Sequence, residues 1–247
     1  MDIENTLMMK GAAAALIFLV GAVGAYLAIK VQASGQSRLL TIGNCVAGGI
    51  FIGAGLIHTL ADSASLYGEL LPNMGYPIWA ATAGVSLVAL LWIDQGLHAA
   101  KPSEGASSLA LFVVLSLHSI IAGMALGVET HPMQALAILI AILAHKGSAA
   151  FALGLRTKAD NYWWSMLGFA VMTPFGVAVG ASLAAAVQGS SALHFEAVFD
   201  SIAAGTFLYV ALFEILPNET KRSDNSTTLI ASTLTGLLLM AVLAIYT

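Results

Sequence analysis

The sequence predicts an all-α, polytopic membrane protein with eight transmembrane helices. Of its 247 residues, 59% are hydrophobic and only 9% are charged, whereas a soluble domain has roughly 25% charged residues. Apolar runs of about 20 residues recur along the whole chain, and this is the length that a helix needs to cross the hydrocarbon core. The chain is therefore predicted to be an integral, multi-pass protein in contact with the lipid bilayer.

Short connections divide the apolar runs into eight expected spans. Pro77 and Pro132 mark two helix starts, where the missing N–H of proline costs nothing. The first run is too long for a signal peptide and follows acidic residues, so it counts as a span. The expected limits are 8–30, 41–61, 77–99, 109–128, 132–155, 163–187, 197–216 and 227–246.

Lysine and arginine residues are concentrated in the odd-numbered connections, which share one side of the membrane. By the positive-inside rule, this side is the cytosolic one. Both termini are therefore expected on the extracytoplasmic side of a plasma membrane or a bacterial inner membrane. The residues concerned are Lys30, Arg38, Lys101, Arg156, Lys158, Lys221 and Arg222.

The second and seventh spans share a pattern that predicts an internal repeat. AGGIFIGAGLIHTL begins at Ala47 and AAGTFLYVALFEIL at Ala203, an offset of 156 residues (203 − 47) that pairs His58 with Glu214. The two spans run in opposite directions, so helices 1–3 and 6–8 are expected to form inverted repeats around helices 4–5, a construction typical of secondary transporters. The prediction is a single transmembrane domain over 1–247, with repeat 1 at about 8–99, a central helix pair at about 109–155 and repeat 2 at about 163–246.

Two histidines in the central spans are the leading candidates for a functional site. HSIIAGMALG begins at His118 and HKGSAAFALG at His145, on either side of a short turn. At about 1.5 Å per residue, the two imidazoles are expected within about 5 Å of the same depth, near mid-bilayer. Two neutral imidazoles suit a borderline dication such as Zn²⁺. The alternative is that each histidine bonds a neighbouring carbonyl group and packs.

Five motifs extend over nearly the whole chain: AGGIFIGAGLIH, HSIIAGMALG, AHKGSAAFALG, TPFGVAVG and AGTFLYVALFEILPNE. Together they resemble the ZIP family of divalent-metal transporters. The resemblance implies a central site on helices four and five, with His118, Ser119 and His145 as metal-binding residues. It implies that Zn²⁺, and often Fe²⁺, Mn²⁺ or Cd²⁺, moves into the cytosol as the substrate, and no prosthetic group is expected.

The sequence departs from the family pattern at two positions. The family usually has an acidic residue four positions after each central histidine, where this chain has Ala122 and Ala149. An i, i+4 carboxylate would lie on the same helix face as the histidine and supply a hard anionic ligand. In its absence, water, Ser119, Ser148 or a carboxylate such as Asp200 is expected to complete the ligand shell.

Lys146 directly follows His145, and this resembles a branch of the family with a His-Lys pair in helix five. Members with two adjacent metal sites have Gln or Glu at this position. The resemblance therefore implies that the ammonium group replaces the second cation and its charge, which leaves a single metal site. Three alternatives are that burial leaves Lys146 neutral, that it snorkels away, or that it faces an aqueous cavity and only tunes the electrostatic field.

The repeat alignment predicts a gate at each end of the metal path. His58 and Asp62 are expected at the outer end of helix two, where they would collect metal. Glu214 and Glu219 are expected at the inner end of helix seven, where they would release it. The alternative is that these are ordinary interfacial polar residues.

The sequence leaves three classes of function open. Import of a divalent metal is the favoured function. The alternative, suggested by Ala122 and Ala149, is a non-transporting or regulatory metal-binding relative of the family. A membrane haem or zinc enzyme is less favoured. No slot wide enough for haem is predicted between the Gly-rich faces, and for a hydrolase the chain lacks HExxH and any buried acid beside the histidines. The chain is therefore not expected to be an enzyme. Surfaces rich in small residues permit a homodimer, and no nucleic acid partner is expected.

Overall fold

The computed structural model describes residues 3–100, 104–157, 159–184, 190–222 and 225–245. These residues are almost entirely helical, and no strand occurs among them. Eight stretches are long and apolar enough to cross a membrane, which confirms the predicted all-α, eight-span architecture. They are Leu7–Ala33, Ser37–Leu70, Ile78–Gly96, Leu111–Val128, Pro132–Gly154, Tyr162–Leu183, Leu193–Arg222 and Ser226–Leu243.

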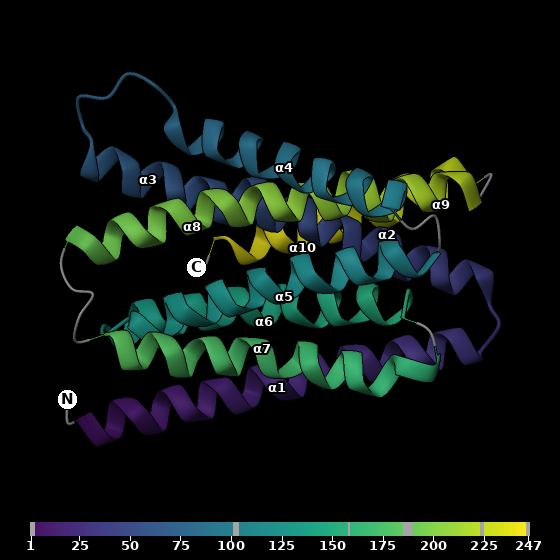
Figure 1. Ribbon diagram of the computed structural model, residues 1–247, viewed down its shortest axis with the longest axis horizontal. Helices are drawn as coiled ribbons and strands as arrows, with labels where there is room; N and C mark the ends of the chain where they lie inside the picture. The colour runs from purple at the N-terminus through teal and green to yellow at the C-terminus, as the bar shows by residue number, and fades with distance from the viewer. Residues whose placement is uncertain (1–2, 101–103, 158, 185–189, 223–224, 246–247) are drawn as a thin grey trace.

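Ten α-helices build the described part of the bundle (Figure 1). They are α1 (Ile3–Ala33), α2 (Ser37–Gly53), α3 (Leu60–Leu70), α4 (Ile78–Ala100), α5 (Glu104–Val128), α6 (Pro132–Gly154), α7 (Tyr162–Leu183), α8 (Ser190–Tyr209), α9 (Leu216–Arg222) and α10 (Ser226–Leu243). The π-helical turns η1 (Ala54–Thr59) and η3 (Val210–Ile215) join α2 to α3 and α8 to α9, and the 3₁₀ turn η2 (Ala159–Asn161) precedes α7.

Two spans extend well beyond their expected limits. The second span continues to Leu70, and the seventh runs from Leu193 to Arg222. Polar residues such as Asp62 and Glu219 lower the hydropathy of these extensions, but they do not interrupt the backbone hydrogen bonds that define a helix. His58, Asp62 and Glu214 therefore lie inside continuous helical spans, while Glu219 lies in the last turn of its span, which ends at Arg222.

The two π-helical turns lie at equivalent places in the sequence. η1 begins at Ala54 and η3 at Val210, which is again an offset of 156 residues (210 − 54). A π-turn accommodates an extra residue within a helix and is frequent at functional sites. The coincidence fits the predicted repeats.

The helix contacts fit the same repeats. α1 packs mainly on α6 and α7 on α5, while α2 packs on α10 and α8 on α4. The predicted repeats make spans 1–3 equivalent to spans 6–8, and span 4 equivalent to span 5. Under this equivalence the contact of α1 with α6 corresponds to that of α7 with α5, and the contact of α2 with α10 corresponds to that of α8 with α4. Glycine permits close approach at equivalent positions: a Cβ atom on Gly49 would collide with the carbonyl group of Thr233, and one on Gly205 with that of Ala83.

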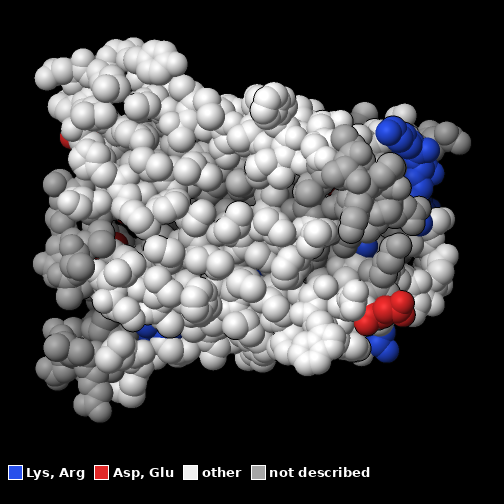
Figure 2. Space-filling model, viewed as in Figure 1, with Lys and Arg blue, Asp and Glu red and all other residues white. Residues whose placement is uncertain are grey.

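Charged residues distinguish the two ends of the bundle. In Figure 1, α1 begins and α10 ends toward the left, while α9 and the turn between α1 and α2 lie at the right. Figure 2 shows most of the visible lysine and arginine at the right-hand end, which fits the predicted cytosolic side. At the other end, the buried Lys10 donates a hydrogen bond to the carbonyl group of Gly127. Lys101 and Lys158 lie outside the described residues.

Candidate metal centre

His118 of α5 and His145 of α6 meet inside the bundle. Their Nε2 atoms lie 3.4 Å apart and their ring centroids 5.5 Å apart. Both residues are buried, with 6% and 5% of their surface exposed. α5 and α6 are joined by the short turn 129–131, so positions at similar distances from this turn reach a similar depth. The structure thus brings together the two histidines that the sequence singles out.

The separation of these nitrogen atoms suits a shared metal ion. Zinc binds imidazole nitrogen at about 2.0–2.1 Å, so two such nitrogens on a tetrahedral ion lie about 3.3–3.4 Å apart. The Nε2 atoms of His118 and His145 already have this separation, 3.4 Å. In the metal-free protein, one ring can instead donate a long N–H···N hydrogen bond to the other.

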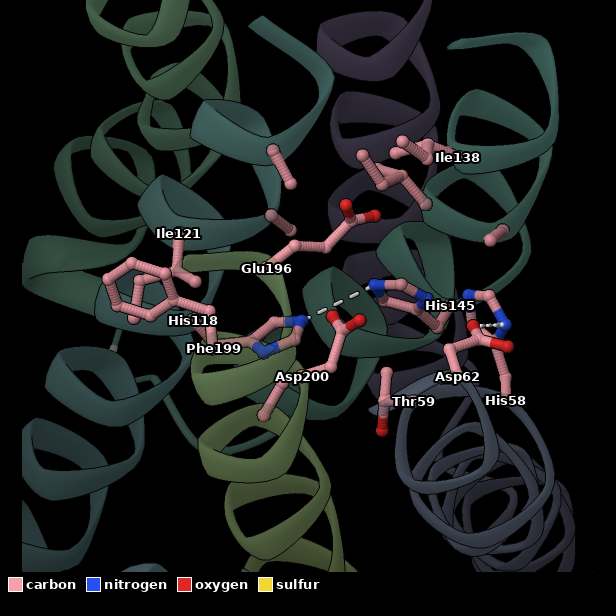
Figure 3. Close-up of a pocket in the computed structure, with 15 residues that line it drawn as sticks. His58, Thr59, Asp62, His118, Ile121, Ile138, His145, Glu196, Phe199 and Asp200 are labelled. Atoms are coloured by element: carbon pink, nitrogen blue, oxygen red, sulfur yellow. Dashed lines mark hydrogen bonds and ion pairs between the residues drawn. The ribbon is translucent and has the colours of Figure 1, made fainter. Parts of the chain in front are cut away.

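A cavity of about 70 Å³ ends at the two rings (Figure 3). This volume exceeds the roughly 10–15 Å³ that a cavity needs to hold one water molecule, so the cavity can hold water. Its lining residues on α5 and α6 lie between the histidines and the turn 129–131, so the cavity occupies the predicted outer half of the bundle. The lining residues are His58, Thr59, Asp62, His118, Ile121, Ala122, Ala125, Ile138, Ala141, Ile142, His145, Glu196, Phe199, Asp200 and Ala203.

Three carboxylates make the cavity acidic. Asp62 comes from α3, and Glu196 and Asp200 come from one face of α8, four residues apart. In Figure 3 the carboxylate of Asp200 is drawn between the two central imidazoles, and Glu196 lies above them. His58 pairs with Asp62 through an Nδ1–Oδ2 distance of 2.8 Å. A cavity lined with carboxylates attracts cations toward the histidines at its end.

Two stacked phenylalanines lie against the other side of the histidine rings. The ring centroid of Phe207 is 4.1 Å from that of His118 and 4.9 Å from that of His145. Phe207 also stacks on Phe51 with a centroid distance of 5.5 Å, and both phenylalanines are completely buried. Because Phe207 follows Ala203 by one turn of α8, away from the cavity mouth, the stack separates the histidines from the inner end.

Polar contacts close that inner end. Glu214 of η3 is buried, and its carboxylate accepts hydrogen bonds from the Arg156 guanidinium and, at 3.2 Å, from the Tyr209 hydroxyl. Arg156 also donates to the backbone carbonyl group of Glu214. Glu219 of α9 is buried and accepts a hydrogen bond from the amide of Asn44 at 2.6 Å. Both candidate inner-gate residues are thus buried and hydrogen-bonded.

Lys146 and Ser119 lie together beside the histidines but outside the cavity lining. The Nζ atom of Lys146 donates to Ser119 Oγ at 3.1 Å and to the carbonyl oxygen of Phe169 at 3.0 Å. It also lies 3.6 Å from the centroid of the Phe169 ring. The lysine therefore points toward α7, and its ammonium group holds the serine hydroxyl.

No complete ligand shell is present in the part of the chain that the structure describes. It contains no group of three or more His, Cys, Asp or Glu side chains that could hold a metal ion. Ala122 lines the cavity without offering a ligand, and Ala149 is buried. The centre therefore offers two nitrogen ligands, and any further ligand must be water or a side chain that moves.

Sequence reasoning misses Glu196, Phe207 and Arg156. Glu196 precedes the expected start of the seventh span by one residue, but its i, i+4 spacing to Asp200 is a usable signal. Phe207 matches Phe51 at the repeat offset of 156 residues (207 − 51), which marks both as equivalent positions. Arg156 contributes only a positive charge to the sequence pattern, and no spacing indicates its bond to Glu214, 58 residues away.

Comparison with known proteins adds an independent observation. A family model described as ZIP zinc transporter matches residues 104–244. The chain is 29% identical over 268 residues to zinc transporter ZIP2 of Mus musculus, covering 85% of this chain and 86% of that protein. It is 29% identical over 245 residues to zinc transporter ZIP2 of Homo sapiens, covering 76% and 79%. It is 27% identical over 259 residues to zinc transporter ZIP1 of Danio rerio, covering 84% and 85%.

Proposed function

Because the chain belongs to the ZIP zinc transporter family, we propose that it carries divalent metal ions, zinc foremost, across the membrane into the cytosol. Members of this family are transporters, so the chain is not an enzyme. Zinc is the first proposed substrate because the similar proteins are named zinc transporters. Fe²⁺, Mn²⁺ and Cd²⁺ are further proposed substrates. The ion is cargo, and no prosthetic group is part of the proposal.

One observation carries the proposed site: the Nε2 atoms of His118 and His145 converge to 3.4 Å at the blind end of an acidic cavity. Neutral imidazole is a good zinc ligand, and two such ligands bind more weakly than the four of a structural zinc site. Weak binding suits a transporter, since the ion must leave again. The remaining coordination positions are filled by water or by a carboxylate of the cavity wall.

The two ends of the path differ in a way that supports import. From the predicted outer side, the cavity leads past His58 and Asp62 to the central histidines. Toward the predicted cytosolic side, the Phe207 ring and the bond between Arg156 and Glu214 block the way. Release then requires α8 and η3 to move relative to α6. In this cycle His58 and Asp62 collect the ion, and Glu214 and Glu219 receive it after the inner contacts open.

Lys146 is the proposed substitute for a second metal ion. Its buried ammonium group lies next to the centre and is held by Ser119 and by the Phe169 carbonyl oxygen. When Lys146 is protonated, its positive charge at this place disfavours a second cation through Coulomb repulsion. Substituting Lys146→Ala removes that charge, so zinc uptake and the number of bound zinc ions should both change. Unchanged uptake and unchanged stoichiometry would refute the substitute role.

A regulatory or merely metal-binding relative is the competing function. Ala122 and Ala149 favour it, because the absence of both carboxylates weakens the central site.

The proposal also includes a membrane location and an assembly. The protein is placed in a plasma membrane or a bacterial inner membrane, with both termini on the extracytoplasmic side, and it forms a homodimer. α4 offers surface for such a dimer, since it is the least buried of the eight spans.

Zinc flux into proteoliposomes tests the proposal. The purified full chain is reconstituted with an internal zinc indicator, and uptake is compared with that of the double variant His118→Ala/His145→Ala. The wild type should take up zinc, and the double variant should lose nearly all uptake because both nitrogen ligands are gone. The matched control is His131→Ala, an exposed histidine outside the cavity lining, which should leave uptake unchanged. Zinc binding without flux in the wild type would favour the regulatory alternative.

A further inference from the structure

We infer that Asp200 of α8 is the third protein ligand of the transported ion, and that it replaces the carboxylates absent at positions 122 and 149. The inference rests on the proposed function, since it completes the site formed by His118 and His145. It assigns the ion an N₂O ligand set drawn from three helices, α5, α6 and α8.

Three acids of the described residues line the cavity: Asp62, Glu196 and Asp200. Asp62 is already paired with His58 at 2.8 Å, and 48% of its side chain is exposed. Glu196 precedes Asp200 by four residues, about 6 Å farther toward the cavity mouth. Asp200 is therefore the carboxylate nearest the histidines along α8, and in Figure 3 it is drawn between their rings.

The register of α8 gives independent support. Asp200 and Phe207 are separated by seven residues, about two turns, so they lie on the same face of the helix. Phe207 packs on both histidine rings, with centroid distances of 4.1 and 4.9 Å. The face of α8 that carries Asp200 is therefore the face turned toward the metal centre.

Hydrogen bonds fix this part of α8 against α3. The hydroxyl oxygens of Ser63 and Ser201 lie 2.6 Å apart, and Ser63 also donates to the carbonyl oxygen of Ala197 at 2.7 Å. Both serines are completely buried. The backbone on either side of Asp200 is thus held in place, and closing the ligand set requires a change in the Asp200 side chain and not in the helix.

A ligand set of two histidines and one aspartate suits a zinc ion. Two imidazoles and one carboxylate form a common zinc set that leaves a coordination position for water. The carboxylate offsets one of the two charges of the ion, and the third ligand raises the affinity above that of a histidine pair. Because α8 belongs to the second repeat and the histidines to the central pair, any movement that separates α8 from α5 and α6 breaks the set. The ligand arrangement therefore couples ion release to helix movement.

Zinc binding and uptake by the full chain test the inference, with Zn²⁺ as the probe. Asp200→Asn keeps the shape of the side chain and removes its charge, so the KM for zinc should rise at least about tenfold, the size expected for a damaged metal shell. Glu196→Gln should have a smaller effect. The matched control is Glu69→Gln, an exposed acid at the same end of the bundle, which should stay within twofold of the wild type.

A rescue variant separates a ligand role from a structural one. Ala122 lines the cavity one turn from His118, so Ala122→Glu in the Asp200→Asn background offers a new carboxylate from α5. Recovery of zinc affinity by this double variant would support the inference. A wild type that transports zinc while Asp200→Asn remains within twofold would overturn it and leave the proposed function intact. A wild type that neither binds nor transports zinc would overturn both.

Discussion

Equivalent segments of the two predicted repeats lie in opposite environments. His58 and Asp62 match Glu214 and Asn218 at the same offset of 156 residues (214 − 58 and 218 − 62). The first pair lines a cavity, and 48% of the Asp62 side chain is exposed. At the second pair, Glu214 is buried and bonded to Arg156, and Asn218 donates to the Glu214 backbone carbonyl oxygen at 2.6 Å.

The difference shows how a nearly symmetric sequence pattern supports an asymmetric path. Both segments contain a π-helical turn, so the local helix geometry is alike. The partners of the two segments differ. Glu214 is bonded to Arg156, whereas the described lining of the cavity contains acids and histidines but no arginine or lysine. In the proposed transport cycle, alternating access would exchange these two environments while the ion is held between them.

The largest effect is expected from breaking the inner contact. Arg156→Ala leaves the buried carboxylate of Glu214 without its cation, and losing one partner of a buried pair costs about 3–5 kcal/mol. We expect the lower end of this range, because 20% of the Arg156 side chain is exposed. The thermal midpoint of unfolding in detergent should fall, and thiol reagents should reach a cysteine placed at Phe207 from the inner side.

Arg38→Ala is the control for this experiment, since Arg38 is an exposed arginine at the same end of the bundle. Equal midpoints for Arg156→Ala and Arg38→Ala would show that the inner contact does not stabilise the closed end.

An intermediate effect is expected from the aromatic stack. Phe207→Leu keeps most of the volume, so its stability cost should be about 1–1.5 kcal/mol. Zinc affinity should fall more in Phe207→Leu than in Phe51→Leu, because Phe207 packs on both histidine rings and Phe51 packs on Phe207. Equal zinc dissociation constants for the two variants, measured by titration, would contradict a supporting role of Phe207 in the centre.

The smallest effect is expected at the cavity mouth. His58→Ala removes one partner of a partly exposed pair and leaves Asp62 in place. The KM for zinc should rise by roughly threefold with an unchanged maximal rate, because a collecting group acts mainly on the rate of association. Uptake measured over a range of external zinc concentrations distinguishes the two parameters. An unchanged KM would remove His58 from the path.

The histidine pair was predictable because it depends on local rules. Eight apolar runs define the spans, and the short turn between the central helices sets the depths of His118 and His145. The extensions of the second and seventh spans escaped prediction, because hydropathy detects burial in lipid and not the continuity of a helix. Glu196 was missed for the same reason.

The side-chain partners were not predictable, because they depend on packing between distant segments. The direction of Lys146 is set by the Phe169 carbonyl oxygen on α7, and that of Glu214 by Arg156, two residues after the end of α6. Neither contact has a fixed spacing in the sequence. The repeat offset indicates which residues are equivalent, but it does not show which of the two ends is closed.

Zinc K-edge X-ray absorption on the metal-loaded, purified protein tests the central claim most directly. The account predicts a shell containing two imidazole nitrogens at about 2.0–2.1 Å in the wild type. It predicts loss of the imidazole scattering in His118→Ala/His145→Ala. A wild-type spectrum without imidazole, or a spectrum that the double substitution leaves unchanged, would contradict the account.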